Sequence, residues 1–285
     1  MSRVYLQDML DGVLFDGLPV NWGAFDLGTF SSTKTLWDYQ QKAVQNLIKA
    51  LWKYYEDFGD YRANESESAN GARKKKFFTW YRNNGLDQDL SIPLTETHKL
   101  AGLLGEYYEI AGEKISYDQF INRACCWMAT GSGKTLVIVK LIEVLRRLIQ
   151  RGEVPPHDIL VLTHRDDLIE QLKKHVHEFN ASHSDLFVRL RELREYADAK
   201  RDNPVLFKER ELTVFYYRSD NLSDVQKEKI IDFRNYDDDG KWYVLLDERT
   251  RAIRKKASAN TSTPSSRVMD SYSISRPPSR IHATW

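Results

Sequence analysis

The chain has 285 residues, of which 41% are hydrophobic and 29% are charged, and its formal net charge at pH 7 is +1. This composition is typical of a globular protein with one large or two modest domains. No apolar run reaches the ~20 residues that span a bilayer, and the first residues lack the cationic and apolar segments of a secretory signal. We therefore expect a cytoplasmic protein without membrane contact. A net charge near zero is no evidence about nucleic acid, because local patches and backbone amides can bind phosphates.

The two cysteines and a pair of histidines predict neither a disulfide nor a metal site. Cys125 and Cys126 are adjacent within an apolar run, and neighbouring residues of a strand point to opposite faces. We expect both to be core thiols. His175 and His177 lie two positions apart on a predicted helix, where their side chains diverge, so we do not expect them to share a metal ion.

The N-terminal region is predicted to contain an irregular arm followed by one long helix. Residues 1–34 are rich in Gly, Asp and aromatic residues and show no clear periodicity. From Leu36 to Tyr55 apolar residues recur at helical spacing, and Thr35 with Asp38 predicts an N-terminal cap for this helix.

A polar stretch at residues 59–95 is predicted to be an insertion. It contains the basic and aromatic run Arg73–Arg82, whose rings could stack on bases while its cations neutralise phosphates. A solvated hairpin whose rings face the core is the other interpretation, and we prefer it. Residues 94–111 and 117–122 are then predicted to be helical.

Strands and helices alternate in the remainder of the chain. Short apolar runs predict strands, and longer amphipathic runs predict helices. The predicted strands are 124–128, 159–162, 214–217 and 242–246, and the predicted helices are 135–148 and 167–179. This alternation predicts an α/β fold with a parallel sheet covered by helices on both faces.

A glycine-rich loop, Met128–Thr135, lies between the first of these strands and its helix. Glycines let backbone N–H groups approach a phosphate, and the helix start adds the positive end of its dipole. We expect Lys134 to contact the β and γ phosphates of ATP and Thr135 to ligate Mg²⁺. Met128 stands where Gly or Ala is usual, and a glycine turn without nucleotide is the alternative. The expected nucleotide-binding residues are Thr130, Gly131, Ser132, Gly133, Lys134 and Thr135.

Two further features complete the predicted nucleotide site. Asp247 and Glu248 follow the strand 242–246, so Asp247 can hold the Mg²⁺ shell and Glu248 can orient and deprotonate the attacking water. A solvated acidic pair is the alternative. Upstream, the amide of Gln40 offers a donor and an acceptor that match the edge of adenine, although ordinary helix surface would explain this residue as well.

Four segments together resemble motifs Q, I, Ia and II of superfamily 2 DEAD/DEAH-box helicases. They are Tyr39-Gln40, Trp127–Thr135, Leu162–Gln171 and Leu245–Glu248, and the resemblance spans roughly residues 30–248. It is closest to the helicase module of restriction-enzyme R subunits of types I and III, and the glycine-rich loop is its most specific part.

The resemblance implies two RecA-like domains that close on ATP and drive movement along double-stranded DNA or strand separation, with Lys134, Asp247 and Glu248 as catalytic residues. It also implies restriction-modification subunits as partners and places Arg165 near the nucleic-acid strand. A surface or helix-capping cation is the alternative for Arg165. A nucleotide switch or a nucleic-acid-binding module without motor activity is the alternative function.

The sequence changes character after Glu248. Arg249-Thr250 stand where the resembled family has Ala-His, and residues 249–285 are basic and rich in Ser, Pro and Arg. A shifted reading frame would explain this, because synonymous codons allow another frame to complete Asp-Glu-Ala-His and to supply an apolar strand ending in Ser-Ala-Thr. A disordered tail is the alternative.

The expected organisation has four parts. They are an arm (1–34), a helix with an insertion (35–115), an incomplete first RecA-like lobe (116–248) and an aberrant tail without regular structure (249–285). A chain of this kind would be inactive as a motor by itself, because it would lack the second lobe of the ATP cleft.

Overall fold

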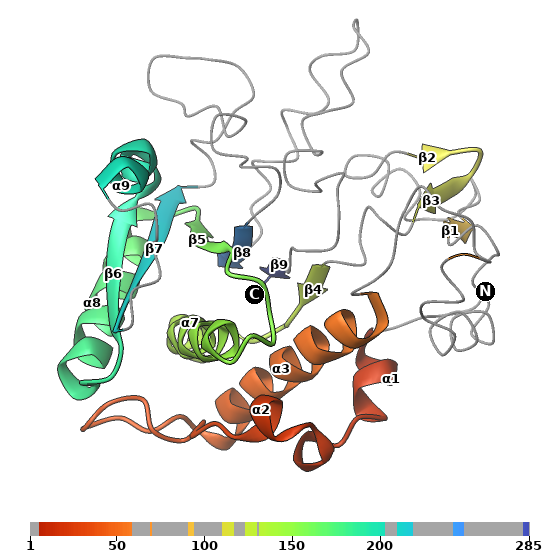
Figure 1. Cartoon of the computed structure of the whole chain (residues 1–285), viewed down its shortest axis with the longest axis horizontal. Coiled ribbons are helices and arrows are strands. Elements are labelled where there is room, and N and C mark those ends of the chain that lie inside the picture. Colours follow the sequence, from red (N-terminus) through yellow and green to blue (C-terminus); the bar gives the residue numbers. More distant parts are fainter. Residues whose placement is uncertain are drawn as a thin grey trace, which may run out of the picture.

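In the computed structural model, the residues described are 6–58, 69, 91–93, 110–116, 123–129, 131–202, 210–218, 242–247 and 282–284. Their largest feature is a six-stranded sheet in the order β4-β9-β8-β5-β7-β6, in which every adjacent pair is parallel (Figure 1). The strands are β4 (Arg123–Cys125), β5 (Asp158–Thr163), β6 (Phe187–Glu192), β7 (Glu211–Arg218), β8 (Trp242–Asp247) and β9 (His282–Thr284).

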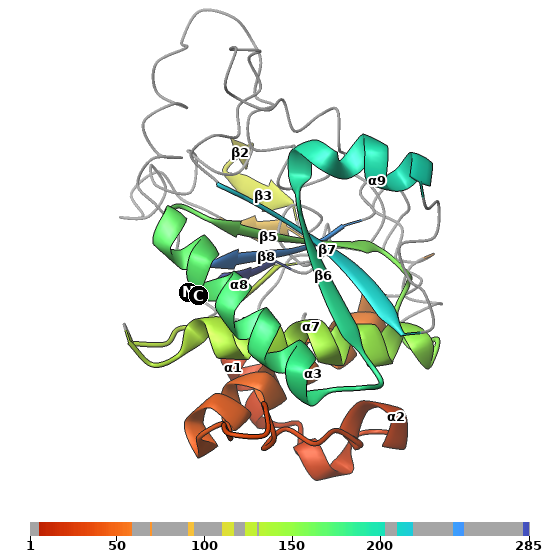
Figure 2. The same cartoon turned by 90° about the vertical axis from the view of Figure 1, so that its left-hand side faces the viewer.

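Helices cover both faces of this sheet, as the alternating sequence pattern predicts. The face with the larger hydrophobic core carries α3 (Asp38–Phe58), α7 (Lys134–Gln150) and α8 (Asp166–Ser182). The opposite face carries η3 (Leu193–Glu195) and α9 (Tyr196–Asp202). Figure 2 shows α7 and α8 on one side of the strands and α9 on the other. The sheet is therefore a RecA-like layer, and the predicted α/β fold is confirmed.

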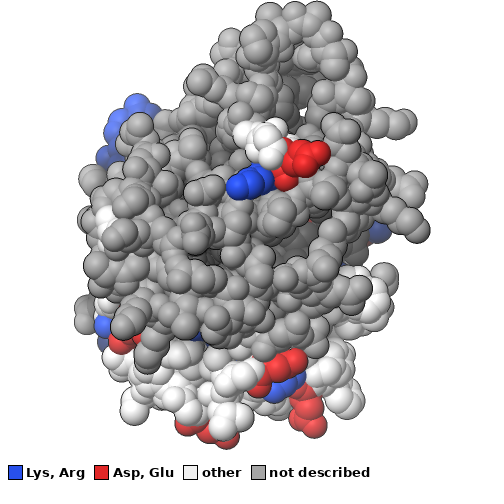
Figure 3. All heavy atoms as spheres, turned by 90° about the vertical axis from the view of Figure 1, so that its right-hand side faces the viewer, with Lys and Arg blue, Asp and Glu red and all other residues white. Residues whose placement is uncertain are grey.

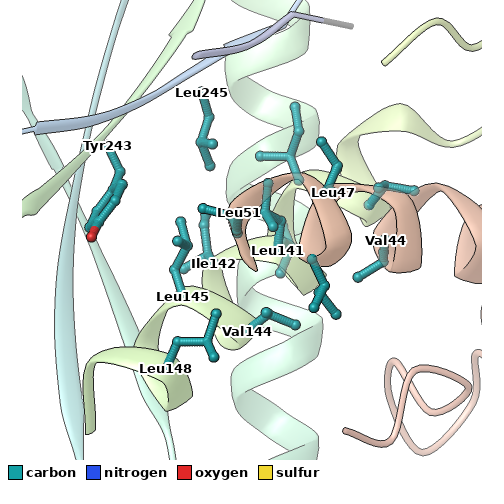
Figure 4. Packing of buried hydrophobic residues seen from close by; sticks show 14 of the residues in the cluster. Val44, Leu47, Leu51, Leu141, Ile142, Val144, Leu145, Leu148, Tyr243 and Leu245 are labelled. Atoms are coloured by element: carbon teal, nitrogen blue, oxygen red, sulfur yellow. The ribbon is translucent and has the colours of Figure 1, made fainter. Parts of the chain in front are cut away.

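The main core lies between α3, α7 and the sheet. Figure 4 shows apolar side chains of α3, including Leu47 and Leu51, interleaved with Leu141 and Leu145 of α7 below Leu245 of β8. Residues of the N-terminal arm belong to the same cluster of buried side chains. The arm, α3 and the sheet thus share one core, because the apolar stripe of α3 packs against α7.

The opposite face has a smaller aromatic core. Trp242, Phe215 and Tyr196 pack with ring centroids 4.9 to 5.9 Å apart. The Tyr196 hydroxyl donates to the buried carboxylate of Asp158 at 2.9 Å, and Lys200 forms an ion pair with the same carboxylate at 2.8 Å. These polar contacts join α9 to the start of β5, which keeps the buried Asp158 satisfied.

The N-terminal arm contains more regular structure than its sequence predicts. It forms α1 (Leu6–Asp11), η1 (Phe15–Gly17) and α2 (Val20–Gly23). The buried Lys49 of α3 donates to the Leu10 carbonyl at 2.7 Å and to the Val13 carbonyl at 3.2 Å. The last carbonyls of a short helix lack partners within the helix, so this lysine holds α1 and the turn after it against α3.

The segment before α3 is anchored to α7 and α8 by charged side chains. Lys140 of α7 donates to the Thr29 carbonyl at 2.7 Å and pairs with Glu143 at 2.8 Å. Glu178 of α8 accepts from the Ser31 hydroxyl at 2.9 Å and from the ammonium of Lys34. These contacts fix the position from which α3 starts.

The start of α3 differs from the predicted cap. The helix begins at Asp38, so its capping position is Trp37 rather than Thr35, which instead bridges to Thr29. The Trp37 N–H donates to the side-chain oxygen of Gln40 at 2.9 Å. A Gln side chain at the third helical position can satisfy the capping residue in this way, which makes a Thr cap unnecessary.

The predicted helix 94–111 is wrong at its C-terminal end, where the chain forms part of a small antiparallel sheet. It contains β1 (Ser91–Pro93), β2 (Ile110–Ala111) and β3 (Lys114–Ser116). Gly112 and Glu113 connect β2 to β3 with φ of 56° and 60°. Two positive φ values in a two-residue loop produce a tight hairpin, which a helical reading cannot accommodate. Residues 94–109, the predicted helix 117–122 and the run Arg73–Arg82 lie outside the described residues.

Candidate functional site

The strand register brings two predicted elements of the site to the same edge of the sheet. Cys125, the last residue of β4, is level with Thr284 of β9, and Thr284 is also level with Leu246 of β8. The glycine-rich loop follows β4, and Asp247 follows Leu246. The loop and Asp247 therefore lie at the carboxyl edge of the sheet, separated by one strand, which is where ligands bind in sheets of this kind.

The loop leads directly into α7 through a left-handed glycine. Gly131 and Gly133 both have φ of 78°, and Gly133 is the N-terminal capping residue of α7. A Cβ at Gly133 would overlap the amide nitrogen of Gln40, whereas one at Gly131 would meet nothing. Gly133 is thus required both by its backbone conformation and by the close approach of α3.

Two side chains from the first turn of α3 hold the loop. The Ser132 carbonyl accepts from the Gln40 amide at 2.8 Å and from the Tyr39 hydroxyl at 3.1 Å. Gln40 is only 2% exposed, and its side-chain oxygen accepts from the N–H of Trp37. Contact between Gln40 and adenine stays a prediction. Sequence reasoning did not predict the contact between Gln40 and the glycine-rich loop.

The electrostatic environment at the start of α7 favours an anion. Its first turn contains Lys134 and no acidic residue, and the first N–H groups of a helix carry partial positive charge. The Lys134 ammonium donates to the Ala129 carbonyl at 3.4 Å, which folds the side chain back over the loop. The Ser132 hydroxyl is buried and has no hydrogen-bond partner in the described part of the chain. These groups fit a phosphate.

Thr135 and Asp247 could supply oxygen ligands for Mg²⁺ at this carboxyl edge of the sheet. Thr135 is buried in the first turn of α7, and Asp247 is 3% exposed and level with Thr163 of β5. Mg²⁺ typically takes one or two protein ligands together with phosphate oxygens and water. The described residues contain no cluster of three or more His, Cys, Asp or Glu side chains that could hold a metal ion by themselves. The residues thus suit an ion bound together with a nucleotide.

Two of the predicted site residues cannot be placed. Thr130 of the loop and Glu248, the expected catalytic carboxylate, lie outside the described residues. The roles assigned to them stay predictions.

Arginines occupy the carboxyl edge beyond Asp247. Arg165 is the residue before α8, and its guanidinium donates to Asp167 at 2.8 Å. This hydrogen bond lowers the pKa of the Asp167 carboxyl. Arg218, level with Thr163 at the end of β7, pairs with Asp166 at 2.8 Å. Sequence reasoning singled out Arg165 but not Arg218, whose position follows from strand register.

Exposed indole rings lie beside the loop. Trp127 is 88% exposed and Trp37 is 71% exposed. The predicted strand 124–128 ends at Cys125, which leaves Trp127 outside the sheet, between β4 and the glycines.

A comparison with protein families gives a match that covers most of the chain. A model of the type III restriction enzyme res subunit family matches residues 33–265. The chain belongs to this family. The match extends past Glu248, the predicted end of the resemblance. Comparisons with curated proteins and with solved structures found no match.

Family membership defines the general activity. Res subunits contain a superfamily 2 helicase module, which implies an ATP-dependent hydrolase that acts on nucleic acid and generally uses ATP and Mg²⁺. Among the described residues, no helix is long and apolar enough to cross a membrane.

Proposed function

We propose that this chain is the ATP-binding lobe of a DNA helicase or restriction-type DNA translocase. The observation that carries the proposal is the position of the glycine-rich loop, which joins β4 to α7 at the same sheet edge as Asp247 and one strand away from it. A phosphate chain bound over the start of α7 would face this carboxylate across the edge.

The residues near the phosphates have distinct proposed roles. Backbone N–H groups of residues 130–135 and the ammonium of Lys134 would bind the β and γ phosphates. Thr135 and Asp247 would hold Mg²⁺, and the ion would neutralise charge that develops on the phosphate oxygens. Glu248 would orient and deprotonate the attacking water.

The second group of proposed roles concerns the base and the DNA. Gln40 would contact adenine, and this would require its amide to exchange at least one present hydrogen bond. Double-stranded DNA would follow the carboxyl edge near Arg165, with restriction-modification subunits as partners. On the face shown in Figure 3, charged side chains of both signs are interspersed and the described residues form no broad patch of one sign.

We infer that the lobe comprises residues 116–248 together with α3 and β9, because α3 packs in the same core as α7 and β9 pairs with both β4 and β8. Translocation requires a second RecA-like domain that closes on the nucleotide, and the described residues form one such lobe. We therefore expect this chain, when tested by itself, to bind ATP without DNA-stimulated hydrolysis.

We also propose that residues 249–285 are encoded in a shifted reading frame. The support is the sequence Asp247-Glu248-Arg249-Thr250, in which Arg-Thr stands where the resembled helicases have Ala-His, although the family model matches through residue 265. Sequencing the gene through codon 248 tests this. Third bases that forbid Ala-His in the alternative frame would exclude the shift.

Nucleotide titration tests the main proposal. Calorimetry with MgATP should give saturable binding to the wild-type chain, and Lys134→Ala should weaken it by tenfold or more, because a charge-assisted phosphate contact contributes about 1.5–3 kcal/mol. Lys173→Ala, which removes an exposed ammonium on α8 paired with Glu170, is the matched control and should bind like wild type. Equal binding by wild type and Lys134→Ala would contradict the assignment of the loop.

A second experiment separates a motor from a nucleotide switch. In a protein whose reading frame is restored, ATP hydrolysis should rise when double-stranded DNA is added. A switch would bind and hydrolyse ATP at a rate that DNA does not change.

A further inference from the structure

Residues 26–36, which we call the strap, lie between α2 and α3 and contact both α7 and α8. In Figure 1 the strap is the loop that joins α2 to α3, and its turn lies below the end of α8. The family match begins at residue 33, so most of the strap precedes it. The strap nevertheless leads directly into the first turn of α3, whose side chains hold the glycine-rich loop.

Hydrogen bonds close the strap on itself. The Leu36 N–H donates to the Gly28 carbonyl at 2.7 Å, and Thr29 forms an antiparallel bridge with Thr35. The carboxylate of Asp26 accepts from the N–H groups of Gly28 and Thr29 at 3.0 and 3.1 Å. The two ends of the strap are thus tied together immediately before α3.

A buried cation of α7 holds this closed segment. Lys140 is 2% exposed, and its ammonium donates to the Thr29 carbonyl at 2.7 Å. It also pairs with Glu143 at 2.8 Å, and Glu143 has Arg147 as a second partner. A buried ammonium needs such partners, because it has lost its hydration. Lys140 lies about two helical turns after Gly133, the capping residue of α7.

These contacts form a ring with the glycine-rich loop. At the end of the strap, the Trp37 N–H donates to the Gln40 side chain at 2.9 Å, and the Gln40 amide donates to the Ser132 carbonyl at 2.8 Å. Ser132 precedes Gly133, where α7 starts, and α7 returns to the strap through Lys140. A shift of the strap would therefore move the groups that hold the loop.

The contacts with α8 act at the other end of the strap. Glu178 accepts from the Ser31 hydroxyl at 2.9 Å, and the Ser182 hydroxyl accepts from the Ser32 N–H at 2.9 Å. Phe30, which is fully buried, lies in the same core. Loss of the Lys140 contact would thus loosen the strap next to α3 without detaching its turn from the lobe.

We propose that Lys140 is a positioning residue for the nucleotide site, because by holding the strap it keeps the Gln40 amide on the Ser132 carbonyl and the loop in the conformation that binds phosphates. Its control of nucleotide affinity rests on the proposed function of the loop. Its hold on the strap is independent of any nucleotide. A loop that is ordered before the ligand arrives binds more tightly, since binding then orders less of the chain.

The first experiment removes the ammonium. Lys140→Met keeps an unbranched side chain but has no donor for the Thr29 carbonyl. Hydrogen exchange of the Leu36 and Trp37 amides should become faster than in wild type. The affinity for MgATP, measured by calorimetry, should fall about fivefold, at the lower end of the usual coupling between linked sites.

Lys49→Met is the matched control. Lys49 is also buried and donates to carbonyls of the N-terminal arm, those of Leu10 and Val13, outside the strap. This variant should speed exchange of the Val13 amide, which donates to the Leu10 carbonyl, and should leave MgATP affinity unchanged. An equal loss of affinity in both lysine variants would overturn the proposal, because general loosening of the arm would then explain it.

A double-mutant cycle tests whether Lys140 acts through Gln40. The ring is already open in Gln40→Leu, so adding Lys140→Met should change MgATP affinity by less than about twofold. The same fivefold loss in both backgrounds would overturn the route through Gln40.

The outcomes separate this proposal from the proposed function. Unchanged exchange at Leu36 and Trp37 in Lys140→Met overturns the hold on the strap. Faster exchange with unaltered MgATP affinity overturns the control of the nucleotide. If the wild-type chain does not bind MgATP, the proposed function fails, while the exchange data still decide whether Lys140 holds the strap.

Asp26→Ala tests the strap if Lys140→Met fails to fold. Asp26 is exposed, so its removal spares the core, yet its carboxylate orders the residues that Lys140 contacts. Exchange of the Leu36 amide should become faster, and MgATP affinity should fall about twofold, as expected for weakening of one hydrogen bond. Asp16→Ala, at an exposed carboxylate of η1, should change neither. Identical results for the two aspartate variants would contradict the role of the strap.

Discussion

The two halves of the six-stranded sheet are built differently. In one half, the strands β5 and β8 have six residues each and β7 has eight, and nearly all of their residues are buried. In the other half, the strands β4 and β9 have three residues each. The long strands form a core whose stability comes from apolar burial, whereas the short strands position a loop. The proposed nucleotide site draws on both halves, because the glycine-rich loop follows the short strand β4 and Asp247 ends the long strand β8.

The largest effect on stability is expected in the half with long strands. Trp242→Ala removes a fully buried ring that packs on Tyr196 and Phe215, and truncation of such a side chain typically destabilises by about 3–5 kcal/mol. Urea denaturation should show this loss as a lower midpoint. Trp37→Ala, at an exposed ring, should change stability by less than about 0.5 kcal/mol. Similar losses in both variants would contradict the burial of Trp242.

A smaller loss, with a clear functional component, is expected at the junction of loop and helix. Gly133→Ala forces a Cβ into a left-handed conformation and against Gln40, so we expect about 2–3 kcal/mol of destabilisation. The MgATP affinity should fall as well. Gly152→Ala has the same backbone strain with φ of 72° but open space around it, and about 1 kcal/mol is expected there. Thermal unfolding and calorimetry measure both quantities, and equal effects in the two variants would exclude the clash.

The anchor before α3 should give the lobe a dependence on pH. Burial alone would raise the pKa of Glu178, but hydrogen bonds from Lys34 and Ser31 outweigh it, and the pKa lies below its ordinary value of 4.5. A lowered pKa in the folded state means that the stabilisation is complete above pH 4.5 and is lost as the pH falls through the folded-state value.

Glu178→Gln tests this dependence. It should lower stability by about 1 kcal/mol at pH 7 and flatten the decline of stability between pH 5 and 3. Glu170→Gln, on the exposed side of α8, should leave both unchanged. Denaturant titrations across this pH range provide the measurement, and identical curves for Glu178→Gln and wild type would contradict the role of the anchor.

The smallest effect is expected at Tyr39, because this side chain is half exposed and shares its acceptor with Gln40. Tyr39→Phe removes one hydrogen bond to the Ser132 carbonyl, which should change stability by about 0.5 kcal/mol. A change of MgATP affinity of about twofold corresponds to this free energy. Tyr55→Phe, which removes a hydroxyl bonded to Tyr243 away from the loop, should leave that affinity unchanged.

The same contrast between the two halves explains what could be predicted from the sequence. Continuous apolar runs gave β5, β7 and β8, and helical periodicity gave α3, α7 and α8, within a few residues at their ends. These elements are buried on a face or on both faces, so their sequences record that burial. The glycine-rich loop and Asp247 were singled out because phosphate and Mg²⁺ chemistry requires particular residue types, and the roles assigned to them stay predictions.

Elements that depend on backbone pairing rather than burial could not be predicted. The edge strand β6 alternates apolar residues with Arg189 and Arg191 and has one neighbour, which resembles a polar loop. The strand β9 has three residues, too few for any periodicity. The Gln40 clamp joins residues 92 positions apart, and no local pattern encodes such a contact. Knowledge of the register was needed for each of them.

The indole of Trp127 gives the chain its own optical reporter. This ring projects into water immediately before the glycines, whereas Trp242 is enclosed in the aromatic core. A water-soluble quencher should therefore reach the first and spare the second. Anything that settles over the loop, whether a nucleotide, another lobe or a second protein, would shield Trp127 from that quencher.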